Sequence, residues 1–302
     1  MKKYIILVFL ITAFGCKQEN KKTNKLQVVT TTTMITDLVK NIGGDKIDIQ
    51  GLMGAGVDPH LYKASEGDVS KLFNADVIVY NGLHLEGKLE DVFENMRHQN
   101  KKTIAVSDAL DKATLIGSEY FASNYDPHIW FNINNWEIIT QYLVDQLCEL
   151  DAENAETYKT NGANYLKTLA SLKITITEEI NTLPIEKRIL VTAHDAFNYF
   201  GKEFQFNVVG LQGLSTATEA GVKDVQRMAS FIEESKVKAV FVESSVPKRT
   251  VEALQEAVKA KGKEIVIGGT LYSDALGSYG TEEGTYVGMY KHNVKIIVNA
   301  LK

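Results

Sequence analysis

Cysteine is scarce in this sequence, with only Cys16 and Cys148 among 302 residues. Cys16 directly follows an N-terminal apolar run and is a candidate for lipidation, which would leave no partner for an intramolecular disulfide. The fold must then be held by its core instead of by cross-links, and a chain of this size can bury enough surface to do so. Cys148 lies in an amphipathic helical pattern, where we expect a small core side chain and not a metal-binding thiolate.

A membrane-spanning run is missing at the N-terminus. Two lysines precede an apolar stretch over residues 4–14, which is about half the length that a bilayer requires. This pattern predicts a signal peptide over residues 1–15. The motif Ala-Phe-Gly-Cys at residues 13–16 resembles a bacterial lipobox, whose cysteine is lipidated, although a plain secretory signal with an incidental cysteine is the alternative. Residues 16–25 are polar and aperiodic, which predicts a flexible tether behind the lipid.

Basic charge is not in excess. The chain carries 33 Lys and Arg residues against 38 Asp and Glu residues, a formal net charge of −5. This balance argues against nucleic acid as a partner, because binding to phosphates requires a basic face, and it is compatible with the capture of cations. The apolar fraction of 44% and the charged fraction of 24% are typical of a soluble globular protein.

The apolar pattern predicts an α/β fold with two lobes. Strand-like and helix-like segments alternate along residues 26–151, and the same alternation returns over residues 185–302. Such alternation is typical of a parallel sheet with helices on both faces, and two domains of about 130 to 150 residues suit the chain length. The expected strands are residues 26–31, 46–50, 76–80 and 103–106, then 188–192, 206–209, 238–242 and 264–267.

One long helix is expected between the lobes, over residues 152–184. Apolar residues recur there at helical spacing, and no proline occurs before Pro184. About 30 residues at 1.5 Å each would reach some 45 Å, which is longer than the usual globular helix. A single rigid connection of this kind would resist the wide hinge opening that flexible crossover strands allow.

Four residues that lie far apart in the sequence are candidate ligands for one metal ion: His60, His128, His194 and Asp274. Each follows an apolar run typical of a strand, or lies in the loop after one, and open α/β sheets bind their ligands at this edge. Two lie in each half, so one ion held by all four would join the lobes. Three imidazoles and a carboxylate suit Zn²⁺ and tolerate other divalent transition metals.

The tripeptide Asp-Pro-His occurs twice, at residues 58–60 and 126–128. Proline fixes its own φ and biases the preceding aspartate towards an extended conformation, so each histidine is presented from a stiff turn. Asp58 and Asp126 are candidates to orient the imidazoles by hydrogen bonds. A single Asp-Pro-His is often only a surface turn, whereas two in one lobe, both after strands, favour a site.

Several other residues near the expected site are ambiguous when taken alone. A histidine in the position of His194 is more often structural, and an aspartate in the position of Asp274 is more often a helix cap. Glu243 follows another strand at the same edge, where it is either an acceptor for a histidine or an unconnected loop carboxylate. We expect Trp130 to pack beneath the site, and we expect His292 and His98 on exposed helix surfaces.

Eight segments, in order along residues 26–302, carry a resemblance to a known family. They are Asp58–His60, Tyr80–Glu86, Asp126–Phe131, Thr192–Phe200, Gly213–Ala220, Glu243–Val246, Leu271–Leu276 and Gly280–Asn293. Together they resemble the solute-binding lipoproteins of zinc and manganese ABC transporters, the TroA-like metal-binding family. The resemblance covers essentially the whole chain behind the tether.

The resemblance implies a binding protein and not an enzyme. It implies two lobes joined by a long helix, with one metal ion in the cleft between them and the four candidate residues as its ligands. The implied function is high-affinity extracytoplasmic capture of a divalent metal and its delivery to the permease and ATPase subunits of an ABC importer. The implied location is the bacterial cell envelope, where a monomeric, exported chain is anchored by the lipid on Cys16, in the periplasm or on the outer face of the membrane.

The chain departs from many zinc-directed members of this family. Residues 111–125 contain no histidine where those members often have a loop rich in His and Asp, and the second half has no cysteine pair. Manganese-directed members more often place a carboxylate at the position of His194. On imidazole count we expect Zn²⁺ as the favoured cargo and Mn²⁺ next, one ion per chain. His84 resembles a structural position of the family and is not expected to be a ligand.

Two other functions stay open on the sequence. A zinc hydrolase of the envelope would need three protein ligands, an open position for water and a general base. The motif His-Glu-x-x-His is absent, and neither Ser-His-Asp nor nucleophile-elbow spacing occurs. A surface adhesin, a role claimed for some relatives, is compatible with the sequence as a second activity, although it would not explain four convergent ligands.

Overall fold

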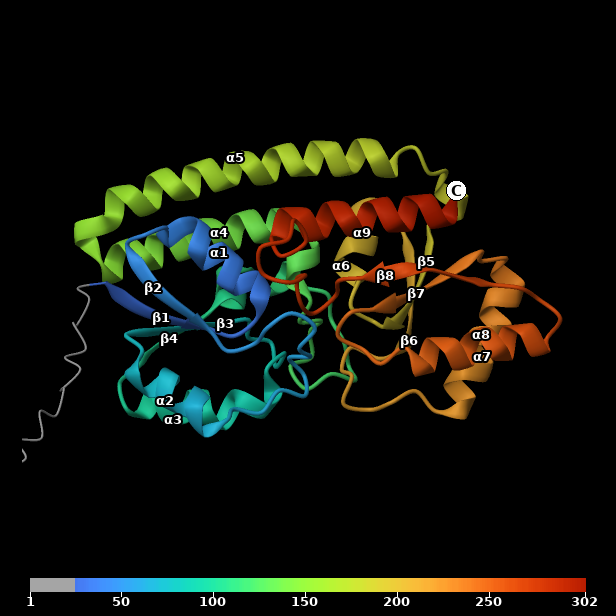
Figure 1. Ribbon diagram of the computed structural model, residues 1–302, viewed down its shortest axis with the longest axis horizontal. Helices are drawn as coiled ribbons and strands as arrows, with labels where there is room; N and C mark the ends of the chain where they lie inside the picture. The colour runs from blue at the N-terminus through green and yellow to red at the C-terminus, as the bar shows by residue number, and fades with distance from the viewer. Residues whose placement is uncertain (1–24) are drawn as a thin grey trace, which may run out of the picture.

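The computed structural model describes residues 25–302, which form two α/β lobes side by side beneath a long helix (Figure 1). The expected signal peptide, almost all of the expected tether and Cys16 lie outside the described residues. Among residues 25–302, no helix is both long enough and apolar enough to pass through a membrane.

The first lobe contains a parallel sheet of four strands in the order β2–β1–β3–β4. Its strands are β1 (Leu26–Thr30), β2 (Ile47–Gly51), β3 (Val77–Tyr80) and β4 (Lys102–Ala105). Helices α1 (Thr33–Gly43) and α4 (Ile133–Leu150) cover the upper face in Figure 1, and α2 (Glu66–Asn74) and α3 (Glu90–His98) cover the lower face. The central strands are buried on both faces, as expected of a parallel sheet between two helical layers.

The second lobe repeats this plan, with the strand order β6–β5–β7–β8. Its strands are β5 (Ile189–His194), β6 (Asn207–Gln212), β7 (Ala239–Glu243) and β8 (Val266–Leu271). Helices α6 (Asn198–Phe204) and α9 (Tyr286–Leu301) lie on the face towards the long helix, and α7 (Val222–Ser235) and α8 (Arg249–Ala260) lie on the other face. The prediction of two parallel-sheet lobes is therefore confirmed.

Strand β8 differs from its expected position. It extends through Gly268 and Gly269, which the sequence placed in the following loop. A Cβ atom at Gly268 would lie 2.7 Å from side-chain atoms of Phe241 and Ala300, and one at Gly269 would lie 2.7 Å from the side chain of Ile296. Both glycines are thus needed inside the strand because α9 packs directly against it.

The long helix is α5 (Ala155–Ile180), whose 26 residues span about 39 Å along the top of both lobes (Figure 1). Helix α9 runs beneath it and reaches back into the first lobe. The ring of Tyr286 stacks on Trp136 with centroids 5.0 Å apart, and its hydroxyl donates to the carbonyl of Trp130 at 2.7 Å. Tyr290 likewise donates to the carbonyl of Phe131 at 2.7 Å. The expected long helix between the lobes is thus confirmed as α5, and α9 packs across their junction as well.

The inner faces of both sheets share one apolar core. This core joins Val28 and Ile104 of the first sheet to Leu190 and Ala239 of the second, through residues of α1, α4, α5, α6 and α9. Smaller separate cores lie beneath α2 and α3 and beneath α7 and α8. The lobes are consequently fused along one side and are not free to separate as rigid bodies.

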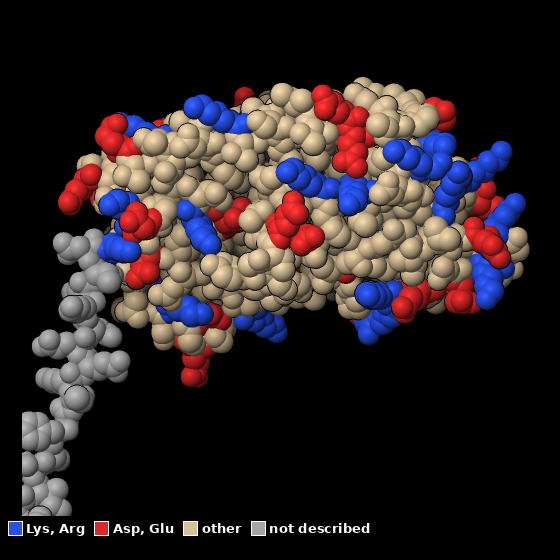
Figure 2. Space-filling view, turned by 45° about the horizontal axis from the view of Figure 1, so that its top comes forward, with Lys and Arg blue, Asp and Glu red and all other residues tan. Residues whose placement is uncertain are grey.

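Charged side chains of both signs are interspersed over the face shown in Figure 2. No broad area of a single sign is visible on that face, which includes parts of both lobes. The negative net charge is therefore not concentrated on this side of the molecule.

Candidate metal centre

The structure brings His60, His128, His194 and Asp274 together where the two lobes meet, with one possible ligand atom of each within 4.8 Å of the others. The Nε2 atoms of the histidines lie 3.8, 3.6 and 3.2 Å, in that order, from the nearer oxygen of Asp274. Ligands of a tetrahedral ion with bonds of about 2.0–2.1 Å would be about 3.3 Å apart. The side chains are at most 2% exposed, so the cluster is compact and buried.

The inward-facing atoms of this cluster have no hydrogen-bond partner. They are the three Nε2 atoms and both carboxylate oxygens of Asp274. Among the side-chain nitrogen and oxygen atoms of residues 25–302, only Gln212 Oε1 and Ser244 Oγ are also buried without a hydrogen-bond partner. A buried polar atom without a partner destabilises a fold, so five of them converging on one point indicate a site into which a cation fits.

Each candidate ligand is placed at the carboxyl end of a sheet. His194 is the last residue of β5, and Asp274 lies three residues beyond β8. His60 lies in the loop between β2 and α2, and His128 lies beyond β4, directly before a short 3₁₀ helix at Ile129–Phe131. Because parallel strands all end at one edge, residues that are distant in sequence converge there.

The two Asp-Pro-His tripeptides adopt the same local turn. The carboxylate of Asp58 accepts a hydrogen bond from the backbone N–H of His60 at 2.9 Å, and that of Asp126 accepts from the backbone N–H of His128, also at 2.9 Å. These are Asx turns, in which the aspartate side chain closes the bend two residues on. Each histidine is thereby projected from a turn that its own sequence stabilises.

Two carboxylates hold imidazole rings in orientation. Asp126 Oδ1 lies 2.7 Å from Nδ1 of His128, and Glu243 Oε2 lies 2.5 Å from Nδ1 of His194. Glu243 also accepts from the backbone N–H of His194 at 2.8 Å. In both cases the contact turns Nε2 towards the centre, as carboxylates do for histidines that bind metals. Glu243 is therefore placed as an acceptor for a histidine and not as an unconnected loop carboxylate.

Asp58 acts differently from the expectation. The structure shows no hydrogen bond from Asp58 to the ring of His60 among the described residues, and its second oxygen instead accepts from the hydroxyl of Thr216 at 2.5 Å. Thr216 belongs to the second lobe, so Asp58 links the backbone of His60 to the opposite lobe. The expectation failed because Asp58 uses its second oxygen for a partner that lies 158 residues away in sequence, which the local motif does not reveal.

The pKa values of the side chains in this cluster are shifted in different directions. Burial alone would raise the pKa of Asp274, but the charge of His194, 3.2 Å away, holds it well below its usual range. Burial alone would lower the pKa of His194, but the carboxylates of Asp274 and Glu243 hold it well above its usual value. Burial lowers the pKa of His60 to about 3. A metal ion entering this site therefore displaces a proton from His194 and finds His60 already neutral.

The remaining histidines lie outside the cluster. His84 Nδ1 lies 2.5 Å from Glu90 Oε1 at the surface, and His98 is exposed beside Glu94. The expectation of an exposed position was wrong for His292, which is half-buried with Nε2 3.1 Å from the carbonyl of Thr270, because α9 packs on β8. Trp130 packs against the ring of His128, with centroids 5.3 Å apart, and donates to the carbonyl of Ser273.

Sequence reasoning missed three residues that hold Asp126 and Asp58 in place. Asn198 donates to Asp126 at 3.1 Å, Tyr199 donates to the carbonyl of the same residue at 3.1 Å, and Thr216 donates to Asp58. All three belong to segments that carried the family resemblance, which was the available signal. Their partners could not be read from spacing, because each pair joins one lobe to the other.

The chain belongs to the family described as zinc-uptake complex component A, periplasmic, which matches residues 28–300. This is a family of metal-binding, solute-binding proteins of ABC importers and not of enzymes, so the hydrolase alternative is not supported and the resemblance drawn from the sequence is confirmed.

Individual relatives agree with this assignment. The chain is 45% identical to the manganese-binding lipoprotein MntA of Bacillus subtilis, over 100% of this chain and 98% of that one. It is also 45% identical to the zinc-binding protein TroA of Treponema pallidum, over 96% of this chain and 92% of that one. The solved structure of the periplasmic zinc-binding protein TroA from Treponema pallidum matches with a TM-score of 0.89 and 46% identity, covering 92% of this chain and 99% of that one.

Proposed function

We propose that this protein captures one divalent transition-metal ion outside the cytoplasm and delivers it to an ABC importer. His60, His128, His194 and Asp274 are proposed as its ligands. The observation that carries the proposal is the convergence of five buried, unpartnered nitrogen and oxygen atoms from these four side chains. A cation at that point would satisfy all five, and its closed shell would leave no open position for reacting water.

Zinc is the favoured cargo, with manganese next. The relatives do not decide between them, because one named for manganese and one named for zinc are equally similar to this chain. Three imidazoles favour Zn²⁺, whereas Mn²⁺ prefers oxygen ligands. Both oxygens of Asp274 face imidazoles, Oδ1 towards His128 and Oδ2 towards His60 and His194. The carboxylate could thus offer a second oxygen to a larger ion.

The organisation of the chain around this site follows from the same proposal. Residues 1–15 would be removed as a signal peptide, Cys16 would carry the lipid, and residues 16–25 would tether the body to the membrane. Residues 26–151 and 185–302 would be the two lobes, with residues 152–184 between them. Relatives named lipoproteins support the anchor and a location in the cell envelope. A monomer delivering to a permease and an ATPase is the proposed working state.

A thermal melt with and without metal tests the proposal. A ligand that binds only the folded state stabilises it by about 4 kcal/mol at a thousandfold excess over Kd. We expect Zn²⁺ to raise the Tm of the metal-free wild type and to leave that of an Asp274→Ala variant unchanged. Elemental analysis after competitive loading with Zn²⁺ and Mn²⁺ would then rank the cargoes. A wild type whose Tm does not respond to either ion would contradict the proposal.

A further inference from the structure

The candidate metal centre is closed on all sides in this structure. Its four side chains are at most 2% exposed, and the lobes around it are fused by α5, α9 and a shared core. Opening the whole molecule would break that core. A cation therefore reaches the centre more easily through a local movement of a surface segment, and one segment beside His60 is built for such a movement.

This segment is the hairpin loop over residues 117–125. Its base is firmly held, because Gly117 and Tyr125 form an antiparallel bridge and the backbone N–H of Asp126 donates to the carbonyl of Ile116 at 2.8 Å. Tyr199 of the second lobe fastens both ends of the loop, as its hydroxyl accepts from the N–H of Ile116 and donates to the carbonyl of Asp126, each at 3.1 Å.

The tip of the loop, residues 118–124, is not held by hydrogen bonds to the other parts of the protein as the base is. The hydrogen bonds of residues 118–124 stay inside the loop: Ser118 N–H donates to Asn124 and Asn124 N–H donates to Phe121, both at 2.8 Å, and Ser123 bonds to Tyr125. No hydrogen bond joins these seven residues to the described chain outside the loop over residues 117–125. The neighbouring Tyr120 is 98% exposed.

Phe121 is the side chain that packs the tip of the loop against the rest of the protein. Its residue is only 8% exposed. Its ring meets the ring of His60 edge-on, at a centroid distance of 6.4 Å and an angle of 86°, and meets the ring of His84 at 6.1 Å and 79°. An apolar ring with no directional bond thus covers the outer side of one candidate metal ligand.

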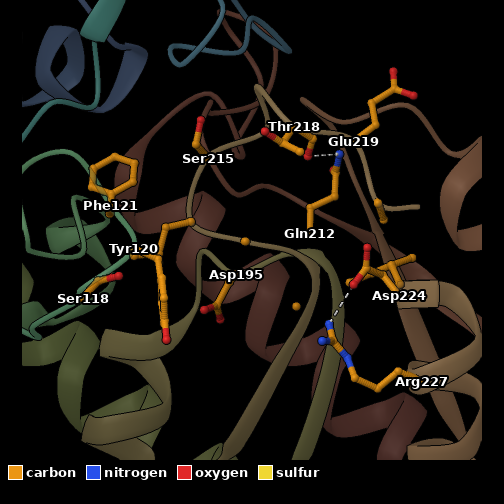
Figure 3. Close-up of a pocket in the computed structure, with 15 residues that line it drawn as sticks. Ser118, Tyr120, Phe121, Asp195, Gln212, Ser215, Thr218, Glu219, Asp224 and Arg227 are labelled. Atoms are coloured by element: carbon orange, nitrogen blue, oxygen red, sulfur yellow. Dashed lines mark hydrogen bonds and ion pairs between the residues drawn. The ribbon is translucent and has the colours of Figure 1, made fainter. Parts of the chain in front are cut away.

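A cavity of about 370 Å³ lies on the other side of Phe121. Figure 3 shows the loop residues Ser118, Tyr120 and Phe121 on one side of it, Gln212, Asp224 and Arg227 on the other, and Asp195 between them. Asp224 pairs with Arg227 at 3.1 Å, but among the described residues no ion pair is formed by Asp195, the neighbour of His194. A carboxylate without a lysine or arginine ion pair therefore lines this cavity, and it is adjacent in the chain to the candidate ligand His194.

We propose that Phe121 is the gate of the metal centre. When the tip of the loop moves about its fixed base, the ring leaves His60 and the centre opens to the cavity that Asp195 lines. A hydrated cation attracted to this carboxylate passes to the imidazoles, and the returning ring closes the site behind it. The inference rests on the proposed capture function and adds the residue that controls the rate of loading and release.

Stopped-flow measurements on Phe121→Ala and Ala122→Ser test the gate. Trp130 packs on His128 and serves as the fluorescent reporter. Metal-free protein is mixed with Zn²⁺ to obtain the association rate constant, and loaded protein is mixed with excess EDTA to obtain the dissociation rate constant. In Phe121→Ala we expect both constants to rise at least about tenfold, equivalent to about 1.4 kcal/mol from the opening barrier. Their ratio, the Kd, should change less than about threefold. Ala122→Ser, on the same loop but exposed and outside the cavity lining, should match the wild type.

The alternatives give different results. A rise in the dissociation constant alone would overturn the gate, because Phe121 would then only hold His60 in place. Unchanged rates in a Phe121→Ala variant that still binds Zn²⁺ would also overturn it. Absence of Zn²⁺ binding in the wild type would overturn the proposed function itself. Phe121→Leu keeps an apolar side chain against His60 and should give rate constants between those of the wild type and Phe121→Ala. This variant tests the gate if Phe121→Ala does not fold.

Discussion

The two Asp-Pro-His tripeptides of this protein have the same sequence and the same turn but different surroundings. Each aspartate accepts from the backbone N–H of its histidine at 2.9 Å. Asp126 then holds the ring of His128 as well and accepts from Asn198 of the second lobe. Asp58 gives its second oxygen to Thr216 of that lobe and leaves the ring of His60 to other contacts.

These different surroundings fix the orientation of the His128 ring and leave that of the His60 ring more adaptable. The ring of His128 is oriented by a buried carboxylate and backed by Trp130, so it is ready to bind before the ion arrives. The ring of His60 is covered instead by Phe121, which is held by packing alone. Identical tripeptides thus present an imidazole in the same way, and the tertiary partners decide how firmly it is held.

The largest expected effect tests whether the two histidines are equal as ligands. His128→Ala and His60→Ala should each weaken Zn²⁺ binding more than about 100-fold, because even the partners that orient metal-bound histidines are worth about 10- to 100-fold. Competition titrations with a chelator of known affinity measure both. Wild-type affinity in either variant would remove that residue from the proposed site, and His98→Ala, an exposed histidine, provides the control.

The next effect addresses the two aspartates. Asp126→Asn should lower metal affinity by about 10- to 100-fold, because the amide cannot accept from both the His128 ring and Asn198 at its two ends. Asp58→Asn should change affinity less than about threefold, since it keeps one oxygen for the His60 backbone. The same chelator titration compares them. Equal losses in the two variants would mean that the carboxylates perform one and the same task.

A third effect concerns protons. The pKa of His194 is raised and that of His60 is lowered to about 3, so near pH 7 the metal must displace the proton of His194 and none from His60. Affinity should therefore rise with pH, by about tenfold per unit for one released proton, until the raised pKa is passed. Calorimetric titrations in buffers of different ionisation enthalpy count the protons. Zero released protons would contradict the charge distribution described for the metal-free site.

The smallest expected effect concerns the hydrogen bond between Thr216 and Asp58, which joins the two lobes. Thr216→Val removes the hydroxyl that donates to Asp58 and should lower the free energy of unfolding of the metal-free protein by about 0.5–1.5 kcal/mol. Thr218→Val, on the same loop but at an exposed threonine, should stay within about 0.5 kcal/mol of the wild type. Urea denaturation followed by circular dichroism measures both. A loss in Thr218→Val as large as in Thr216→Val would assign the effect to the loop and not to the bond.

The sequence was informative where a local pattern decides the outcome. The apolar run before His194 predicted a strand with the histidine at its end, and β5 ends at that residue. The helix expected over residues 152–184 appears as α5, shortened at both ends by turns. Periodicity predicts such elements because burial on one face or both imposes it on each segment separately.

The sequence was uninformative where a partner comes from elsewhere in the chain. Gly268 and Gly269 suggested a loop, but they form the strand against which α9 packs. Neither the bond between Asp58 and Thr216 nor the contact between Phe121 and His60 has a local signature, since both depend on how the lobes are placed. Composition likewise did not indicate that α9 would join α5 in connecting the lobes.

The packing of α9 also bears on how the protein comes to be folded. This helix is formed by residues 286–301, yet Tyr286 and Tyr290 bond to backbone carbonyls 156 and 159 residues earlier. During synthesis the inner face of the first lobe therefore cannot be completed until the residues of α9 have been made. Domains normally fold as units from the N-terminus as they are made. The first lobe cannot do so completely, because the last helix of the chain supplies part of its core.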